Sequence, residues 1–481
     1  MQNSIVHYSK VKSDSACVRI DAEFFKEEYL SIETFLRNKP HKDLQDFGIK
    51  IYHPSEIKRE YTELGGALFL RAQNVRPLEV DLDSNRVYIS LEDAKKLGRN
   101  QIQKADILIT RTGANFGQCA IYLEKERSIA SSHTFIVKSP CLNPFFLTVF
   151  LNTKCGRKLI DKGMYGASQP EIAPFYLYRI PVPIFRDDFY VLIERIYRKS
   201  FNFIKLSKDL YSQAEKVFIS ELGLLNWEPR YKMSFIGNYS DVKTADRIDS
   251  EYFQPMYDDL LEKVRHYRNG YKLLGDIVTI RKCIEPGSQA YEENGIPFLR
   301  VSNLSKFGIV NDNKQYISEE LYEQLKSYQP EKGEILLSKD ATPGIAYYLN
   351  KEPGNMIPSG GILRLKVKKD DKAIYPEYLT LVLNSVVVGK QIERDIGGSV
   401  INHWLVDQVK KTLIPILPES IQKDISDKVA DSFMKHDQSV KLLDIAKRGV
   451  EMAIEKSEEE AEKWLNEEVN HAGSSIHLES R

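Results

Sequence analysis

The sequence of 481 residues contains no long apolar run and no paired cysteines. No apolar stretch approaches 18 residues, and the first eight residues are largely polar, so the sequence indicates neither a membrane span nor a signal peptide. The five cysteines are odd in number and include no Cys-x-x-Cys pair. That usage is typical of reduced thiols, so we expect a cytoplasmic protein that contacts no membrane.

Motifs for catalysis and metal binding are also missing. The glycines at residues 113 and 117 are not followed by Lys-Ser or Lys-Thr, so this stretch predicts a turn between strands rather than a phosphate-binding loop. None of the nine histidines has His-x-x-x-His or Cys-x-x-His spacing, and no Gly-x-Ser-x-Gly occurs. We therefore expect no catalytic residue, metal site or cofactor on this chain, which favours a binding protein over an enzyme.

One tetrapeptide keeps an enzymatic alternative open. Asn143-Pro144-Phe145-Phe146 resembles the Asn-Pro-Pro-Tyr/Phe motif of amino-methyltransferases that act on adenine. However, Phe145 replaces the second proline, and no glycine-rich cofactor-binding turn precedes the motif at the usual spacing. We expect Asn143-Pro144 to start a helix, with a self-contained DNA adenine methyltransferase as the alternative.

The net charge is zero, from 68 Lys and Arg against 68 Asp and Glu, but the charge is unevenly spread. Residues 40–180 carry 20 basic against 15 acidic residues, and residues 268–418 carry 20 against 18. Residues 419–481 carry 9 against 15. Two mildly basic regions fit a nucleic-acid footprint confined to part of the molecule.

The clearest positive feature is an internal duplication of domain size. Residues 69–75, Phe-Leu-Arg-Ala-Gln-Asn-Val, return at residues 298–304 as Phe-Leu-Arg-Val-Ser-Asn-Leu. Each copy predicts a short strand that leaves an Arg and, three residues later, an Asn at its polar end. Further matches follow in the same order, pairing 19–25 with 247–253, 88–90 with 316–318, 106–110 with 334–338, 151–153 with 383–385 and 180–183 with 414–418. The period is much longer than that of solenoid repeats, so each copy is predicted to be a domain.

A long helical stretch follows each copy. Residues 187–222 contain no Pro or Gly and carry apolar residues every seven positions, and the stretch after Pro418 carries a second apolar face. Sustained stripes of this kind predict helices that pack along other helices. The candidates for helix packing and partner docking are Ile196, Phe203, Leu210, Val217, Val429, Phe433, Val440 and Val450.

The predicted fold class is α+β. Two duplicated mixed α/β domains are separated by two long antiparallel helices, which form a coiled-coil-like spacer with pseudo-two-fold symmetry. The expected boundaries are 1–185 for the first domain, 186–223 for the first helix, 224–246 for a connector, 247–418 for the second domain, 419–468 for the second helix and 469–481 for a flexible tail. Within the first domain we expect a strand over residues 67–75 and helical structure over residues 144–162. A helix of about 35 residues spans about 50 Å, or about one and a half turns of B-DNA.

The duplicated block resembles the target-recognition domains of type I restriction–modification specificity (S) subunits. The second copy carries the likeness in residues 297–304, in Lys332-Gly333-Glu334 with the apolar residues after it, in Gly397-Gly398-Ser399 and in the closing helix. The first copy has the same order more loosely, with Lys104-Ala105-Asp106 and Gly166-Ala167-Ser168-Gln169 at the corresponding steps.

This resemblance implies a non-catalytic reader of double-stranded DNA. In the family, each target-recognition domain reads one half of a bipartite sequence, and the paired helices set the gap and dock two methyltransferase (modification) subunits. Restriction subunits complete the complex. The resemblance therefore implies that S-adenosylmethionine, ATP and Mg belong to the partner subunits and that this chain holds no cofactor.

Base sequence is read by side chains that form paired hydrogen bonds with base edges, chiefly Arg or Lys with guanine and Asn or Gln with adenine. Phosphate contacts position a domain without specifying sequence. The loop at 110–115 and its counterpart at 338–343 differ in these side chains, as two domains that read different half-sites would. The candidates for DNA binding are Arg71, Gln73, Asn74, Arg76, Arg111, Thr112, Asn115, Gln118, Ser132 and His133 in the first copy and Arg300, Ser302, Asn303, Lys306, Lys339, Thr342 and Ser359 in the second.

Other interpretations accompany these. Arg71 and Arg300 occur in both copies, so they are also candidates for a structural or phosphate-binding role, with Asp106 and Glu334 as their expected partners. A two-headed adaptor that binds protein or glycan is a third hypothesis for the whole chain, and it would show no salt-dependent affinity for DNA.

Overall fold

The computed structural model of the protein describes residues 8, 9, 11, 19–56, 58, 60–62, 65–82, 86–113, 115–126, 128–166, 169–310, 315–368, 374–396 and 402–471. The chain divides into two compact units: unit 1 is Met1–Asn202 with Gln438–Arg481, and unit 2 is Phe203–Asp437. Each unit combines helices with short strands, which confirms the predicted α+β class with two duplicated domains and two long helices. Among the described residues, no helix is both long and apolar enough to cross a membrane.

The two ends of the mixed α/β domain in unit 1 pair with each other. Strand β1 (His41–Asp43) runs antiparallel to β15 (Pro181–Pro183), with Lys42 opposite Val182. Helix α2 (Glu27–Arg37) precedes β1 and buries Tyr29 and Leu36. Proline has no amide to donate and therefore suits a short strand at an edge, which fits the two prolines of β15.

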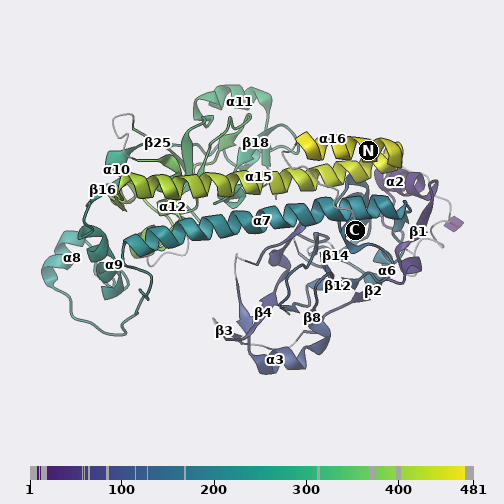
Figure 1. Ribbon diagram of the computed structural model, residues 1–481, viewed down its shortest axis with the longest axis horizontal. Helices are drawn as coiled ribbons and strands as arrows, with labels where there is room; N and C mark the ends of the chain where they lie inside the picture. The colour runs from purple at the N-terminus through teal and green to yellow at the C-terminus, as the bar shows by residue number, and fades with distance from the viewer. Residues whose placement is uncertain are drawn as a thin grey trace. The chain divides into compact units, whose positions relative to one another are not determined.

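Two sheets form the middle of unit 1. The first has the order β10-β9-β12-β2 with antiparallel neighbours, and its strands are Cys119–Ile121, Ile107–Thr110, Thr134–Lys138 and Lys50–Tyr52. The second has the order β3-β7-β4-β11-β8, with strands Tyr61–Thr62, Tyr88–Ile89, Ala67–Leu70, Ser128–Ala130 and Gln101–Ile102. Strands β4 and β11 run parallel. Figure 1 shows β4 and β8 beside the short helix α3 (Leu91–Lys96).

The helical segment predicted over residues 144–162 consists of two helices, α4 (Pro144–Leu151) and α5 (Lys154–Lys162). The break occurs because Thr153 caps α5, with its Oγ1 accepting a hydrogen bond from the Gly156 amide at 3.1 Å. Asn143 caps α4 by accepting from the amides of Phe145 at 3.0 Å and Phe146 at 3.1 Å. Both phenylalanines are buried, so Asn143-Pro144 is the helix start that was predicted.

Unit 2 repeats the plan of unit 1. Strand β16 (Tyr271–Leu273) pairs with β26 (Leu413–Pro415), as β1 pairs with β15. One sheet has the order β17-β25-β22-β23, with strands Val278–Lys282, Ile362–Val367, Glu334–Ser338 and Ala346–Tyr348. The other has the order β21-β18-β24, with strands Gln315–Ile317, Ile296–Leu299 and Ile357–Pro358, and β18 runs parallel to β24.

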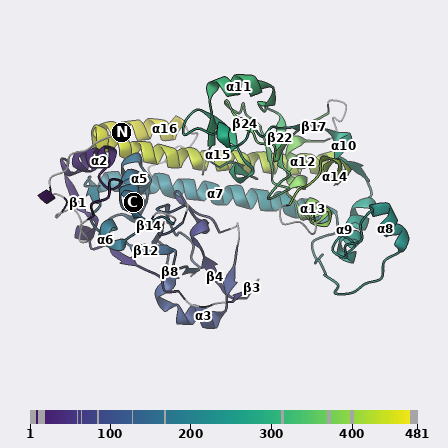
Figure 2. The ribbon, with the colours of Figure 1, turned by 180° about the vertical axis from the view of Figure 1, so that it is seen from behind.

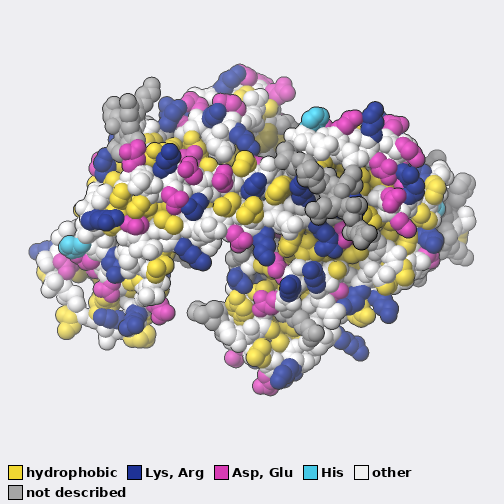
Figure 3. All heavy atoms as spheres, viewed as in Figure 1, with side chains coloured by type: hydrophobic (Ala, Val, Ile, Leu, Met, Phe, Trp, Pro, Cys, Tyr) yellow, Lys and Arg dark blue, Asp and Glu magenta, His cyan; other side chains and the backbone are white. Residues whose placement is uncertain are grey.

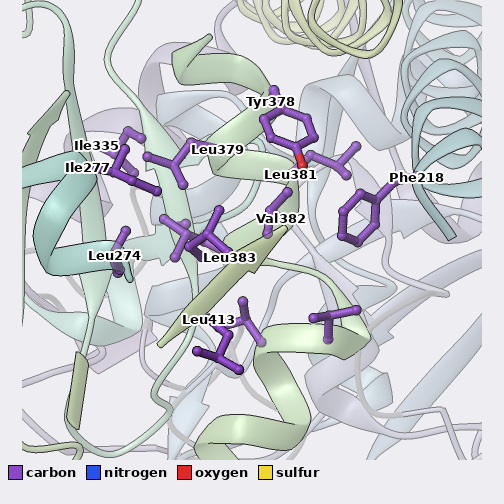
Figure 4. Packing of buried hydrophobic residues seen from close by; sticks show 14 of the residues in the cluster. Phe218, Leu274, Ile277, Ile335, Tyr378, Leu379, Leu381, Val382, Leu383 and Leu413 are labelled. Atoms are coloured by element: carbon purple, nitrogen blue, oxygen red, sulfur yellow. The ribbon is translucent and has the colours of Figure 1, made fainter. Parts of the chain in front are cut away.

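In the core of unit 2, helix α12 (Pro376–Leu383) packs between the β17-β25-β22-β23 sheet and the second half of the long helix α7 (Asp187–Glu221). Figure 4 shows Leu379 and Val382 of α12 among Ile335, Leu274 and Phe218. The Tyr378 ring lies edge-on to Phe218 at 6.2 Å, and its hydroxyl donates to the Pro415 carbonyl at 2.7 Å. Each buried apolar side chain of this size contributes about 1.5–3 kcal/mol, so this cluster joins the helix firmly to its own domain.

The two long helices are α7 (Asp187–Glu221) and α15 (Glu419–Glu455). Helix α7 ends in a Schellman motif: Gly223 has φ +64°, its amide donates to Ser220, and the Leu224 amide donates to Ile219. The second predicted helix is interrupted after Glu455, and the chain continues as α16 (Glu458–His471). The strand expected over residues 67–75 is also shorter, because β4 ends at Leu70 and a 3-10 turn, η2 (Ala72–Asn74), follows.

Within each unit, the parts of α7 and α15 that belong to it lie side by side and run in opposite directions (Figures 1 and 2). In unit 1 the Ser200 and Ser439 hydroxyls are 2.8 Å apart, and in unit 2 the Ser207 and Ser432 hydroxyls are 3.1 Å apart. All four serines are buried. Small side chains let helix backbones approach closely, and each hydroxyl finds a partner across the seam.

Candidate nucleic-acid interface

The repeated Arg-x-x-Asn segment forms the same turn in both units. In unit 1, Asn74 Oδ1 accepts from the Arg71 amide at 2.9 Å, and Nδ2 donates to the Asp81 carbonyl at 3.1 Å. In unit 2, Asn303 Oδ1 accepts from the Arg300 amide at 3.1 Å, and Nδ2 donates to the Val310 carbonyl at 3.3 Å. Both asparagines are buried, so the amide side chains hold the turn that follows β4 and β18.

A second repeated element is the loop after β9 and β22. In unit 1 the Gln118 amide donates to Thr110 Oγ1 at 2.8 Å, and in unit 2 the Ile345 amide donates to Ser338 Oγ at 2.8 Å. A left-handed glycine completes each loop, Gly117 with φ +71° and Gly344 with φ +97°. The backbone frame is therefore shared, although the loop in unit 2 is one residue shorter.

Backbone hydrogen bonds define which residues of the two loops are equivalent. The Arg111 amide donates to the His133 carbonyl and the Lys339 amide to the Gly361 carbonyl, both at 2.8 Å. The Ile172 amide donates to the Arg111 carbonyl at 3.2 Å and the Trp404 amide to the Lys339 carbonyl at 2.8 Å. Bridges also join Thr112 to Glu171 and Asp340 to His403. The equivalent pairs are therefore Arg111 with Lys339, Thr112 with Asp340, His133 with Gly361 and Glu171 with His403.

In unit 1 these elements line a pocket of about 410 Å³. It brings together five of the residues predicted to bind DNA, which come from two segments far apart in the sequence and from the turn after β11. We call it the loop pocket, and its lining residues are Tyr61, Arg71, Ala72, Gln73, Thr112, Gly113, Asn115, Ser131 and His133. Gln73 and His133 are exposed, so an amide and an imidazole face solvent at the pocket.

Arg111 lies beside the loop pocket and is held on three sides. Its guanidinium pairs with Glu171 at 2.9 Å, donates to the Ser132 carbonyl at 3.2 Å and contacts His53 Nε2. Burial and the neighbouring guanidinium lower the pKa of His53 below its usual value. These contacts use much of the donor capacity of Arg111, so its main effect is to fix the loop and supply positive charge.

The corresponding region of unit 2 is centred on Asp340. Its carboxylate contacts Lys339 Nζ at 2.5 Å through Oδ2 and His403 Nδ1 at 2.8 Å through Oδ1. The His403 side chain is 59% exposed, whereas the neighbouring Trp404 is fully buried and donates to Asp395 at 3.0 Å. Trp404 thus anchors the segment that presents His403 to solvent.

The remaining predicted residues of unit 1 lie near the loop pocket without lining it. Arg76 forms an ion pair with Asp81 at 3.4 Å. Gln118 ends the loop after β9 and is half-buried. Ser132 is buried, and its hydroxyl donates to Glu56.

The remaining predicted residues of unit 2 are more dispersed. Ser302 and Thr342 are exposed at the turn after β18 and in the loop after β22. Lys306 is exposed as well, but its ammonium lies over the Tyr211 ring of α7 at 4.8 Å. Ser359 is buried, and its amide donates to the Leu299 carbonyl at 2.8 Å.

Two expectations need correction. Asn74, Asn303 and Ser359 are buried, as are Thr112 and Ser132, so these side chains are less accessible to DNA than expected. The amide side chains of Asn74 and Asn303 hold the turns instead. The expected partners of Arg71 and Arg300 are also wrong, because Asp106 pairs with Lys138 at 3.2 Å and Glu334 with Arg364 at 2.7 Å. The steps at Gly397-Gly398-Ser399 and at Ala167-Ser168 lie outside the described residues.

Sequence reasoning missed four residues of these sites: His53, Tyr61, Glu171 and His403. Each reaches its site through pairing between segments far apart in the chain, and none belongs to a local motif. The duplication could have pointed to His403 only after the backbone equivalence with Glu171 was known.

The predicted helix-packing residues divide into two groups. Ile196, Val429, Phe433 and Val450 are buried within their own units. Phe203, Leu210 and Val217 are half-buried, and Val440 is 46% exposed. The central rows of the helix seam are instead Ile193, Ser200, Ser207 and Ala214 on α7 and Ile425, Ser432, Ser439 and Ala446 on α15, all buried. Partner docking therefore stays a prediction, and of these eight residues four keep exposed surface that a partner could contact.

Charges of both signs are intermixed on the face that Figure 3 displays. In the described part of the chain, no group of three or more His, Cys, Asp or Glu residues is arranged to hold a metal ion.

Comparison with known proteins gives a family match in the second half of the chain. Residues 270–436 match the family model described as the type I restriction modification DNA specificity domain. No curated protein sequence matches the chain. Solved structures that resemble it include the type I restriction–modification S subunit from M. genitalium, with 12% identity, 88% of this chain and 95% of that chain covered and a TM-score of 0.39. The HsdS subunit from Thermoanaerobacter tengcongensis has 14% identity, 88% and 96% coverage and a TM-score of 0.26. Superpositions this loose carry no argument about the site.

Proposed function

We propose that the chain is a DNA specificity subunit, on the premise that residues 270–436 match the family model described as the type I restriction modification DNA specificity domain. Each unit reads one half of a bipartite, gapped target in double-stranded DNA. The chain does no chemistry itself and works with two methyltransferase subunits, which restriction subunits join. S-adenosylmethionine, ATP and Mg are held by those partners.

The observation that carries this proposal is a shared loop frame with different side chains. The turn after β4 and β18 and the loop after β9 and β22 have matching backbone hydrogen bonds in the two units. The residues that this frame presents differ at all four equivalent positions identified above. A fixed frame with exchanged polar groups is what two readers of different sequences require.

The exposed groups at the loop pocket suit base reading. The amide of Gln73 can donate to and accept from an adenine edge, and imidazole nitrogens can donate or accept singly. Arg76 and Arg111 engage in ion pairs with Asp81 and Glu171, so we assign them to positioning and to phosphate attraction. Gln73, Asn115 and His133 are then the base-reading candidates of unit 1.

We assign the long helices to the gap between half-sites and to docking of the methyltransferases. Leu206, Met434 and Val440 are exposed apolar residues of α7 and α15, and such residues are available to a partner. The self-contained methyltransferase is disfavoured, because the Asn143 amide side chain caps α4 and donates to Glu194 at 2.6 Å. Binding of S-adenosylmethionine by the isolated chain would revive that alternative.

The test is to sequence the methylome of a host that carries this gene with its neighbouring methyltransferase gene, and of the same host without this gene. We expect a bipartite methyladenine motif that disappears with the gene. Replacing residues 110–118, in unit 1 only, should change one half of that motif. Unchanged methylation, together with no preference of the purified complex for a gapped site, would refute the proposal and favour the adaptor hypothesis.

A further inference from the structure

In each unit, a histidine contacts the loop after β9 or β22, but the two histidines stand at different positions. In unit 1, His133 Nδ1 lies 2.6 Å from Thr112 Oγ1. In unit 2, His403 Nδ1 lies 2.8 Å from Asp340 Oδ1. Thr112 and Asp340 are equivalent, whereas His133 is equivalent to Gly361 and His403 to Glu171. The histidine therefore comes from a different segment in each unit, whereas the residue that contacts it stands at the equivalent position.

Steric space explains why unit 2 does not use the position of His133. A Cβ atom on Gly361 would lie 2.9 Å from Val301 Cγ2 and 3.5 Å from the Asp340 carboxylate. A histidine at 361 would therefore force Val301 to shift, although its Cβ would make only an ordinary contact with Asp340. At the position of His403, unit 1 has Glu171, whose carboxylate is engaged by Arg111 at 2.9 Å and by the Tyr165 hydroxyl at 2.7 Å.

The two holding residues differ in hydrogen-bond polarity. An ionised carboxylate only accepts hydrogen bonds, so Asp340 requires the proton of His403 on Nδ1. In neutral His403, whose side chain is 59% exposed, Nε2 is then an acceptor. The Thr112 hydroxyl can donate or accept, so His133 is free to present Nε2 as a donor or as an acceptor.

We propose that His133, held by Thr112, and His403, held by Asp340, are base-reading residues that make the two half-sites different. This inference rests on the proposed function and identifies the determinants of specificity within it. His403 accepts a hydrogen bond through Nε2 from an exocyclic amino group of adenine or cytosine, the donors that the major groove offers. His133 reads the other half-site from a different point on the same frame.

The test uses the full chain in complex with its methyltransferase, with competition binding to duplexes that carry each base-pair substitution in the target. His403→Ala should reduce discrimination about tenfold at one base pair of one half-site, the order expected for one base contact. His133→Ala should do the same in the other half-site. The matched controls are His266→Ala in unit 2, at the residue that follows the helix Pro255–Arg265, and His471→Ala in unit 1, at the last residue of α16. Both histidines are exposed, and these variants should leave every preference unchanged.

A second variant tests the polarity. Asp340→Asn keeps the size of the side chain, but its amide can donate to Nδ1 and so place the proton of His403 on Nε2. The preferred base at that position should then change from one that offers an amino donor to one that offers an acceptor, while the other half-site stays the same. Because His403 is exposed, His403→Ala should also keep the thermal unfolding temperature of the wild type.

Two results would overturn the inference. Unchanged discrimination in the histidine variants, with a wild type that does prefer a gapped target, would refute it and leave the proposed function intact. Uniformly weaker binding to all duplexes would indicate phosphate contacts and would also refute it. If the wild type showed no gapped preference, the proposed function would fail first and the inference with it.

Discussion

The variant Asn303→Ala distinguishes two possible roles of the asparagine in the turn that both copies share. A structural asparagine and a base-reading asparagine respond differently to this substitution. The substitution removes the acceptor of the Arg300 amide and the donor of the Val310 carbonyl, at 3.1 and 3.3 Å. Asn303 is 2% exposed, so water does not replace these bonds readily. Leaving a buried backbone group unsatisfied costs about 1–3 kcal/mol, and for the pair we expect a loss of about 3 kcal/mol.

This loss should be visible in both unfolding and hydrogen exchange of the full chain. For a domain of about 150–250 residues, 1 kcal/mol lowers the melting temperature by about 2–4 °C, so unit 2 should melt about 6–12 °C earlier. The Arg300 amide should exchange faster, because its acceptor is gone. Amides in unit 1, including that of Arg71, should exchange at the wild-type rate.

The control is Asn355→Ala, because Asn355 is an exposed asparagine of the same unit, and it should leave both measurements unchanged. In the complex with its partners, Asn303→Ala should weaken recognition of one whole half-site. An Asn303→Ala protein with wild-type stability, and with altered preference at a single base pair, would refute the structural role and restore the base-reading role.

Three further predictions concern the frame around these sites. Arg364→Met leaves the buried Glu334 carboxylate without its 2.7 Å partner and should lower the free energy of unfolding by about 3–5 kcal/mol. The double variant Glu334→Leu with Arg364→Met should recover much of that loss. Equal losses of unfolding free energy in the single and double variants, measured by denaturant titration, would contradict this reasoning. Gly344→Ala puts a Cβ 2.5 Å from Ile392 Cδ1 at φ +97°, so it should destabilise more than Gly270→Ala, where φ is +74° and nothing lies within 4 Å. The Cys119 thiol is buried and burial raises its pKa, so it should react with a thiol reagent only on unfolding, unlike the exposed Cys141.

The duplication and the long helices were predictable because they depend on patterns that repeat along the chain. Apolar residues at strand spacing located β4 and β18, and the absence of Pro and Gly located α7. The seam between the helices was not predictable from apolar periodicity, because Ser200, Ser207, Ser432 and Ser439 occupy its centre. A buried serine that bonds to another serine behaves as a small core residue, and that pairing is visible only in three dimensions.

The candidate site was predictable in its loops but not in its detailed chemistry. The segment 110–118 and its counterpart stood out as polar loops between strands, and the structure brings Thr112, Asn115 and His133 to the same pocket. Asn74 and Asn303 were predicted to read bases because asparagine serves both to contact adenine and to hold a turn through its side chain. Their burial, which depends on the turns that they themselves hold, could not be inferred from spacing.

Because His133 and His403 stand at non-equivalent positions, comparing the two copies position by position understates their likeness. At the four equivalent positions the copies read Arg, Thr, His, Glu and Lys, Asp, Gly, His, so no residue is shared. In space, both present a cationic side chain, a residue that bonds to an imidazole Nδ1, and that imidazole. If discrimination depends on where the imidazole stands on the frame, then Gly361→His alone should not convert unit 2 to the preference of unit 1. The glycine must change together with Asp340 and His403, because His403 already contacts Asp340, the residue that a new histidine at 361 would need as its hydrogen-bond partner.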